Sequence, residues 1–205
     1  MSPRHHPAPE ILADYASGML APGFGLVIGA HLEQCGECRS KVASLEAASG
    51  AALADLPAAA VAPDALPRIM ARLDGQAAPV PTADRRTFFE RLPLKRQRWS
   101  APGIWVAAVD TPHAPEDRVY VVSSAPRVRS ALHSHSGIEF CTVLSGGFRD
   151  GRQTYWAGDF AATDPSITHR PIAIGSERCV CLFATEGRLA PRDWIGRIAF
   201  RLGNV

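Results

Sequence analysis

The chain has 205 residues, 46% of them apolar and 20% charged, which suits one large or two small globular domains. Its net charge of +2 gives no bulk positive field for nucleic-acid binding. Residues 1–80 hold five basic and eight acidic residues, a net of −3, so this part disfavours DNA and suits a basic protein partner. Because no signal-peptide core and no run of roughly 18 apolar residues is present, we expect a cytoplasmic protein that does not enter a membrane.

The first third of the chain has the apolar spacing of three helices. Apolar residues recur at helical spacing over residues 10–20, and Pro22-Gly23 ends this segment. A second helix is predicted over about residues 24–35. A third is predicted after Gly36, with an inward face formed by Val42, Leu45, Ala48 and Ala52. A core this thin usually needs a further staple such as a metal ion.

A metal-binding pattern lies between the second and third predicted helices. His31 and Cys35 are four residues apart, so a helical turn puts both side chains on one face, and Cys38 completes a Cys-x-x-Cys pair. Structural zinc takes four tetrahedral nitrogen or sulfur ligands, and these residues supply three. The pair His5-His6 is the obvious source of the fourth. We therefore predict a zinc ion that holds the helices together, with the choice between the two histidines open.

One more amphipathic helix is predicted after the bundle. It begins near Pro63, and its apolar face is formed by Leu66, Ile69, Met70 and Leu73. This helix either docks on a partner or packs back onto its own bundle. Residues 76–98 follow as a predicted linker, which divides the chain into a helical domain, residues 1–75, and a second domain, residues 99–205.

After the linker the apolar pattern changes to that of short strands. β-Branched and aromatic segments alternate with Gly, Pro and charged turns, as in a sandwich or barrel. These segments are residues 104–109, 118–124, 128–133, 138–145, 153–163, 167–174, 179–184 and 194–202. The sequence thus predicts an α+β protein of two domains, a zinc-stapled helical bundle followed by an all-β domain.

A second candidate metal site lies in the β half. His133 and His135 alternate along a predicted strand and share a face, and Glu139 follows a Ser-Gly bend from which its carboxylate can reach the same cavity. His169 would come from a distant strand. Three histidines and a carboxylate suit zinc, iron, manganese or nickel, and ligand type alone does not choose among them.

Three cysteines accompany this second site. Cys141 lies two residues after Glu139, so strand alternation turns it inward, and Cys179 and Cys181 share one face of a later strand. Disulfides are disfavoured in the cytosol, where buried cysteines serve either as small packing residues or as oxidation-sensitive thiols. Both interpretations stay open, and we take all three as candidate redox-sensing residues.

The β half also resembles a known family. The residues that meet the first cupin motif, His-x-His-x3-Glu-x6-Gly, are His133, His135, Glu139 and Gly146. Gly158 through Pro165 to His169 resembles the second motif, although Ile167 stands where that motif usually has glycine and its trailing asparagine is missing. The resemblance implies that residues 99–205 form a cupin, a small β-barrel of the jelly-roll type.

The whole chain has the domain order of a second family. An early His-His-Pro and a helical His-x3-Cys-x-x-Cys, followed by a detached helix and a cupin, resemble the ChrR-type anti-sigma factors. The resemblance implies zinc in the helical domain, bound by His6, His31, Cys35 and Cys38. It implies a divalent metal in the cupin, with zinc favoured, bound by His133, His135, Glu139 and His169. Cys179 and Cys181 match a cysteine pair in the family.

The resemblance also implies a function. It points to a zinc-dependent anti-sigma factor, not an enzyme, that binds and inhibits an extracytoplasmic-function (ECF) sigma factor and contacts no nucleic acid. The cupin would sense singlet oxygen or other oxidative stress and trigger release of the sigma factor. The alternative is a cupin-type metal-dependent dioxygenase or isomerase with an accessory helical domain. A DNA-binding repressor fits worst, because residues 1–80 are acidic and show no basic recognition helix.

Overall fold

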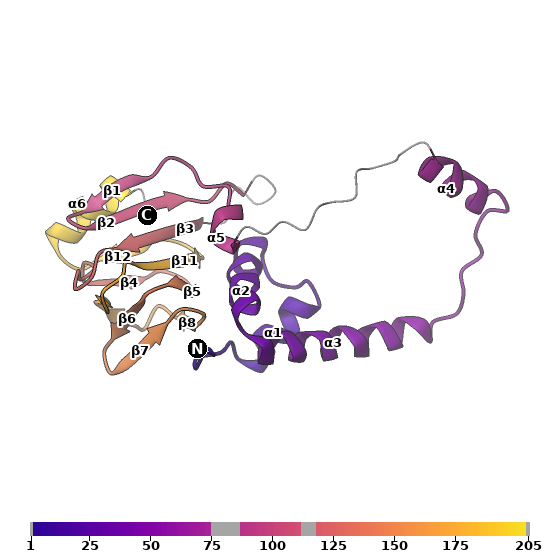
Figure 1. Ribbon diagram of the computed structural model, residues 1–205, viewed down its shortest axis with the longest axis horizontal. Coiled ribbons are helices and arrows are strands. Elements are labelled where there is room, and N and C mark those ends of the chain that lie inside the picture. The colour runs from indigo at the N-terminus through magenta and orange to yellow at the C-terminus, as the bar shows by residue number, and fades with distance from the viewer. Residues whose placement is uncertain (1, 75–86, 112–117, 204–205) are drawn as a thin grey trace.

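The computed structural model describes residues 2–74, 87–111 and 118–203 and places a helical part beside a β-rich part (Figure 1). The helices are α1 (Pro9–Ala16), α2 (Pro22–Gln34), α3 (Gly36–Ala54), α4 (Ala65–Asp74), α5 (Phe88–Arg91) and α6 (Trp194–Gly203). The strands are β1 (Arg98–Ala101), β2 (Ile104–Ala108), β3 (Arg118–Ser124), β4 (His133–His135), β5 (Glu139–Ser145), β6 (Gly147–Asp150), β7 (Gln153–Trp156), β8 (Phe160–Thr163), β9 (Thr168–His169), β10 (Ile172–Ile174), β11 (Cys179–Thr185) and β12 (Leu189–Pro191). Among the described helices, none has the length and hydrophobicity needed to cross a membrane.

Helices α1, α2 and α3 form the bundle, and α2 lies between the other two helices and the large sheet. Both α1 and α2 begin at a proline, where the missing N–H leaves no hydrogen bond unmade. Helix α2 contacts α1 and α3 on one side and strands β5 and β11 on the other. Because it is enclosed on both sides, seven of its residues are buried, among them Val27 and Ile28.

Helix α3 extends well beyond the bundle, which corrects part of the predicted core (Figure 1). Only Cys38 and Val42 are buried along α3, whereas Leu45, Ala48 and Ala52, which we expected to face inward, are exposed. The apolar spacing is helical as predicted, but the second half of α3 has no neighbouring element among the described residues to pack on. Met19, in the predicted apolar stripe of the first helix, is also exposed because α1 ends before it.

The β-rich part consists of three antiparallel sheets. The largest has the strand order β1-β2-β3-β11-β5-β8, and the two small sheets have the orders β10-β6-β7 and β12-β4-β9. Residues 194–202, predicted as a strand, form helix α6 instead, because Trp194, Ile198 and Leu202 recur every four residues, a helical period. The predicted strand over residues 128–133 is also wrong, since only an isolated bridge at Arg129 and the first residue of β4 fall within it.

One hydrophobic core runs through the helical part and the large sheet. Phe24 of α2 packs edge to face on Phe140 of β5, with 4.7 Å between the ring centroids, and Phe140 packs on Phe160 of β8. At the same boundary the Thr142 hydroxyl donates a hydrogen bond of 2.9 Å to the carbonyl of Val27. The bundle is therefore fixed to the sheet by buried apolar and polar contacts.

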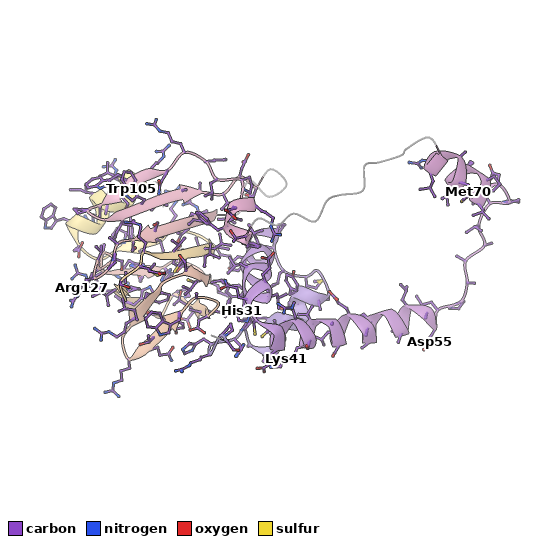
Figure 2. The ribbon with its side chains drawn as sticks, viewed as in Figure 1. His31, Lys41, Asp55, Met70, Trp105 and Arg127 are labelled. Carbon is purple, nitrogen blue, oxygen red and sulfur yellow. The ribbon has the colours of Figure 1, made fainter. Side chains whose placement is uncertain are left out.

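Helix α4 lies apart from the rest of the described structure (Figures 1 and 2). The side chains of its apolar face, Leu66, Ile69, Met70 and Leu73, are 49% to 68% exposed. Of the two alternatives for this helix, the structure shows the detached one. Residues 76–86 of the predicted linker fall outside the described residues, whereas its later part contains α5 and the first residue of β1.

Candidate metal centres

Four predicted ligands meet where α2 passes into α3. The ligand atoms of His6, His31, Cys35 and Cys38 all lie within 4.8 Å of one another. His6 Nδ1 lies 3.4 Å from the Sγ atom of Cys35 and 3.4 Å from that of Cys38. Nitrogen at about 2.1 Å and sulfur at about 2.3 Å from a tetrahedral zinc are separated by about 3.6 Å. The nitrogen–sulfur spacing therefore fits a tetrahedral site with two nitrogen and two sulfur ligands.

Cys35 sits at the break between the two helices. It adopts an extended conformation (φ −115°, ψ 102°), ends α2 and serves as the N-cap of α3. Its Sγ accepts a hydrogen bond of 3.4 Å from the backbone N–H of Cys38. The positive end of the α3 dipole lies at this point, and it favours negative charge on sulfur.

His31 is fully buried and has one unpaired nitrogen. Its Nδ1 donates a hydrogen bond of 2.6 Å to the carbonyl of Gly158, in the turn between β7 and β8, whereas Nε2 has no hydrogen-bond partner in the described structure. The Nδ1 proton fixes the tautomer and leaves the lone pair on Nε2. Burial lowers the pKa of His31, so the ring is neutral at pH 7. A buried unpaired nitrogen beside two thiols is well suited to a metal ion.

The Cys38 thiol is protonated when no cation is near. Burial raises the pKa of Cys38 to about 12. A bound dication reverses this effect, because thiolates ligate metal and the protons leave on binding. Two imidazoles and two thiolates form a donor set that suits zinc.

The structure separates His5 from His6. His6 joins the cluster, whereas His5 Nε2 donates a hydrogen bond of 3.1 Å to the carbonyl of Thr154. The His5 ring also lies 4.4 Å from the ring of Tyr155. Of the two candidates left open by the sequence, the structure places His6 beside the other three candidate ligands. His6 is also the histidine that the family resemblance implies.

A second cluster forms in the β-rich part from His133, His135 and His169. The Nε2 atom of His169 lies 2.9 Å from Nε2 of His135 and 3.1 Å from Nε2 of His133. Strand alternation puts the first two on one face of β4, and β9 pairs beside β4 with His169 opposite His133. Two distant sequence motifs thus meet at one point.

The hydrogen bonds of this cluster favour the binding of a cation between its histidines. His133 Nδ1 donates a hydrogen bond of 2.8 Å to the carbonyl of Ala131. His169 Nδ1 donates a hydrogen bond of 2.5 Å to a carboxylate oxygen of Asp150. When His133 and His169 both carry their proton on Nδ1, their Nε2 lone pairs face each other. These Nε2 atoms lie 3.1 Å apart, so the lone pairs repel each other unless a cation lies between them. Burial lowers the pKa of His133 to about 4, so a neutral ring is ready to ligate. Asp150, which sequence reasoning missed, orients His169.

Glu139 lies beside the three histidines and not among them. Its Oε1 is 3.8 Å from His135 Nδ1, and the Tyr120 hydroxyl donates 2.7 Å to its Oε2. Burial raises the pKa of Glu139 to about 7. A nearby dication would lower that pKa again. The role of Glu139 as a fourth ligand stays a prediction.

A cavity of about 330 Å³ adjoins this cluster. His133, His169 and Glu139 line it, together with all three cysteines of the β half: Cys141, Cys179 and Cys181. The Sγ atoms of Cys179 and Cys181 lie 3.5 Å apart. Burial raises the pKa of Cys141, so its thiol is protonated and a weak nucleophile at neutral pH. The predicted inward position of Cys141 is confirmed, whereas its redox role is not tested by this geometry.

Comparison with known proteins identifies the family. A family model described as the ChrR Cupin-like domain matches residues 94–190. The anti-sigma-E factor ChrR of Cereibacter sphaeroides is 32% identical over 210 residues, which cover 97% of each chain. The chain belongs to the ChrR family of anti-sigma factors. The family resemblance drawn from the sequence is thereby confirmed.

A solved structure of a ChrR protein is similar to nearly the whole chain. The crystal structure of Rhodobacter sphaeroides SigE in complex with the anti-sigma ChrR matches with a TM-score of 0.77 and 33% identity, covering 90% of this chain and 100% of that one. This confirms the predicted fold class, helices followed by a cupin. The crystal structure of an acetylacetone dioxygenase from Acinetobacter johnsonii is similar over 47% of this chain and 68% of the dioxygenase chain, with 14% identity and a TM-score of 0.39. This similarity is too distant to inform function.

Proposed function

We propose that this chain binds an ECF sigma factor and keeps it inactive in the cytoplasm. The related ChrR protein was crystallised as the anti-sigma factor in complex with SigE, and it aligns with 90% of this chain. The observation within this structure that supports the proposal best is α4, an amphipathic helix with no partner among the described residues. A sigma factor is the partner that gives such a helix a function.

The apolar face of α4 is suited to a groove on another protein. Its four large apolar side chains are half to two-thirds exposed, and burial of each would contribute about 1.5–3 kcal/mol. An amphipathic helix that places such a face in a groove is a common recognition mode. Leu45 and Leu53, exposed on the outer half of α3, extend the apolar surface of the helical part.

In this proposal, zinc bound by the N-terminal cluster has a structural role. Four protein ligands fill its tetrahedral shell and leave no position for a substrate. Cys35 and Cys38 join the end of α2 to the start of α3, and His6 ties the beginning of the chain to both. The bundle itself buries few large side chains, so this cross-link fixes the relative positions of its helices.

In the same proposal the cupin is a sensor and not an enzyme. A second divalent metal, for which we favour zinc, would be held by His133, His135 and His169 together with Glu139. Three or four ligands leave room for a small oxidant beside the cavity. The cysteines that line this cavity, Cys141, Cys179 and Cys181, are the proposed targets of singlet oxygen or peroxide, whose reaction releases the sigma factor.

The test is co-purification of the full chain with an ECF sigma factor from the same genome. We expect a one-to-one complex that is lost in Cys35→Ser/Cys38→Ser and kept in the control Cys179→Ser/Cys181→Ser. If the metal-loaded wild type retains no sigma factor, the anti-sigma function is wrong, and an assay of the cupin for dioxygenase or isomerase turnover takes its place.

A further inference from the structure

The segment that delivers His6 is bound to the cupin through its backbone. The N–H groups of Arg4 and His5 donate hydrogen bonds of 2.6 and 3.0 Å to Oδ1 of Asp159. The N–H of Phe160 donates 3.0 Å to the carbonyl of His5. Residues next to a candidate zinc ligand are therefore fixed by the turn between β7 and β8, more than 150 positions later in the sequence.

The carboxylate of Asp159 is buried and accepts hydrogen bonds from this segment on one oxygen and from its own turn on the other. The residue is only 2% exposed, and its second oxygen, Oδ2, accepts a hydrogen bond of 2.7 Å from the N–H of Trp156. Three backbone N–H groups thus converge on one buried carboxylate. A buried carboxylate is costly unless donors satisfy it, and in return its charge strengthens each of the hydrogen bonds.

The same turn holds a second candidate ligand. The carbonyl of Gly158 accepts the 2.6 Å hydrogen bond from His31 Nδ1. Gly158 has φ +90°, and a Cβ atom there would lie 2.7 Å from Cγ of Pro3 and 3.2 Å from Cβ of Gln34. Only glycine lets the turn approach both the start of the chain and the end of α2 this closely. Figure 2 shows His31 at this boundary between helices and sheets.

We propose that the β7–β8 turn of the cupin is part of the N-terminal metal site, with Asp159 as the residue that positions His6. The inference rests on the zinc site of the proposed function and adds that the cupin sets how fast this zinc leaves. Tyr155, which contacts the His5 ring and lines the cupin cavity, connects that cavity to the same segment. A change in the cavity wall thus has a short physical route to the zinc ligands.

Replacement of Asp159 by asparagine tests the positioning role with little change in shape. Asparagine has one acceptor oxygen, and its amide NH2 would face a backbone N–H in either orientation. At least one of the three hydrogen bonds is lost, and the charge is lost from all of them. The matched control is Thr142→Val, which removes a buried hydrogen bond from the same boundary without touching the turn.

The readout is cobalt bound to the full chain in place of zinc. Thiolate-to-cobalt charge transfer in the near ultraviolet reports the N-terminal site alone, because the cupin cluster is formed by histidines. We expect the band of Asp159→Asn to decay at least about tenfold faster than that of wild type when a chelator is added, as for other residues that orient metal ligands. The band of Thr142→Val is expected to decay at the wild-type rate.

Two results overturn the inference. In the first, the charge-transfer band of a folded Asp159→Asn decays at the wild-type rate. In the second, the band decays equally faster in Asp159→Asn and Thr142→Val, which indicates only a loosened boundary between the helices and the sheet. Should Asp159→Asn not fold, Gly158→Ala decides in its place. Its Cβ atom would lie 2.7 Å from Cγ of Pro3 and push the turn away from the start of the chain, so a faster decay supports the inference and an unchanged decay refutes it. A wild type with no thiolate-to-cobalt band would instead refute the metal site of the proposed function.

Discussion

The carboxylate of Asp150 on β6 and the imidazole of His169 on β9 form a hydrogen bond of 2.5 Å, Nδ1 to Oδ2, across 19 residues of sequence. The bond holds the proton on Nδ1 and turns the Nε2 lone pair to the other two histidines. It also places a carboxylate behind one ring of the cluster, where it holds that ring in the orientation that a metal ligand needs.

Asp150→Asn therefore weakens metal binding in the cupin by about 10- to 100-fold. A competition titration with a coloured chelator measures this affinity, and Asp110→Asn, at an exposed position paired with Lys95, is the control. The N-terminal metal stays bound in both variants. Equal cupin affinities for Asp150→Asn and wild type would show that Asp150 does not orient the cluster.

Phe140→Ala destabilises the whole chain by about 3–5 kcal/mol, because the ring lies between Phe24 and Phe160 in the shared core. Urea unfolding followed by circular dichroism is expected to show the bundle and the sheet losing structure together. Phe89→Ala, at an exposed position of α5, changes the stability little. Two separate transitions, only one of them shifted by Phe140→Ala, would contradict a shared core.

Ile69→Asp on α4 lowers the affinity for the sigma factor by at least about 30-fold, which corresponds to about 2 kcal/mol of lost apolar burial. The stability of the free chain stays the same because Ile69 is already exposed. Titration calorimetry with the purified sigma factor measures the change. Ala71→Asp places the same charge on the opposite face of α4 and leaves the affinity near the wild-type value; similar losses for the two variants would rule out the apolar face as the contact.

Cys179→Ser/Cys181→Ser abolishes induction of sigma-dependent genes by light and a photosensitiser, while repression in the dark is unchanged. The reason is that both thiols line the cupin cavity beside the histidine cluster, on strand β11, which lies far from α4 (Figure 1). A reporter gene under a sigma-dependent promoter provides the readout, and Cys141→Ser shows whether the third thiol takes part. Full induction in Cys179→Ser/Cys181→Ser would rule out this pair and place the sensor elsewhere, for instance at the metal.

Most of the candidate ligands were readable from the sequence because their spacing is local. His31, Cys35 and Cys38 lie within one helical break, and His133 and His135 alternate along one strand. The same reasoning could not find Asp150 or Asp159, whose partners are distant in sequence and defined only by sheet pairing and packing. The turn at residues 157–159 interrupts what was predicted as one strand over residues 153–163.

Other predictions failed because a local pattern does not show what packs on it. The outer half of α3 has helical spacing, but Leu45 is exposed because no other element in the described part of the chain packs on it. In residues 194–202 the period-four recurrence of apolar residues marks helix α6, although the segment stands among strands. The attachment of the bundle to the sheet through Phe24 and Phe140 was likewise invisible to patterns read one segment at a time.

The most direct test of the account is transcription in vitro from a sigma-dependent promoter, with purified core polymerase, the ECF sigma factor and the metal-loaded full chain. We expect that one equivalent of the wild-type chain stops transcription and that Cys35→Ser/Cys38→Ser at the same concentration does not. Undiminished transcription with an excess of the metal-loaded wild type would contradict it.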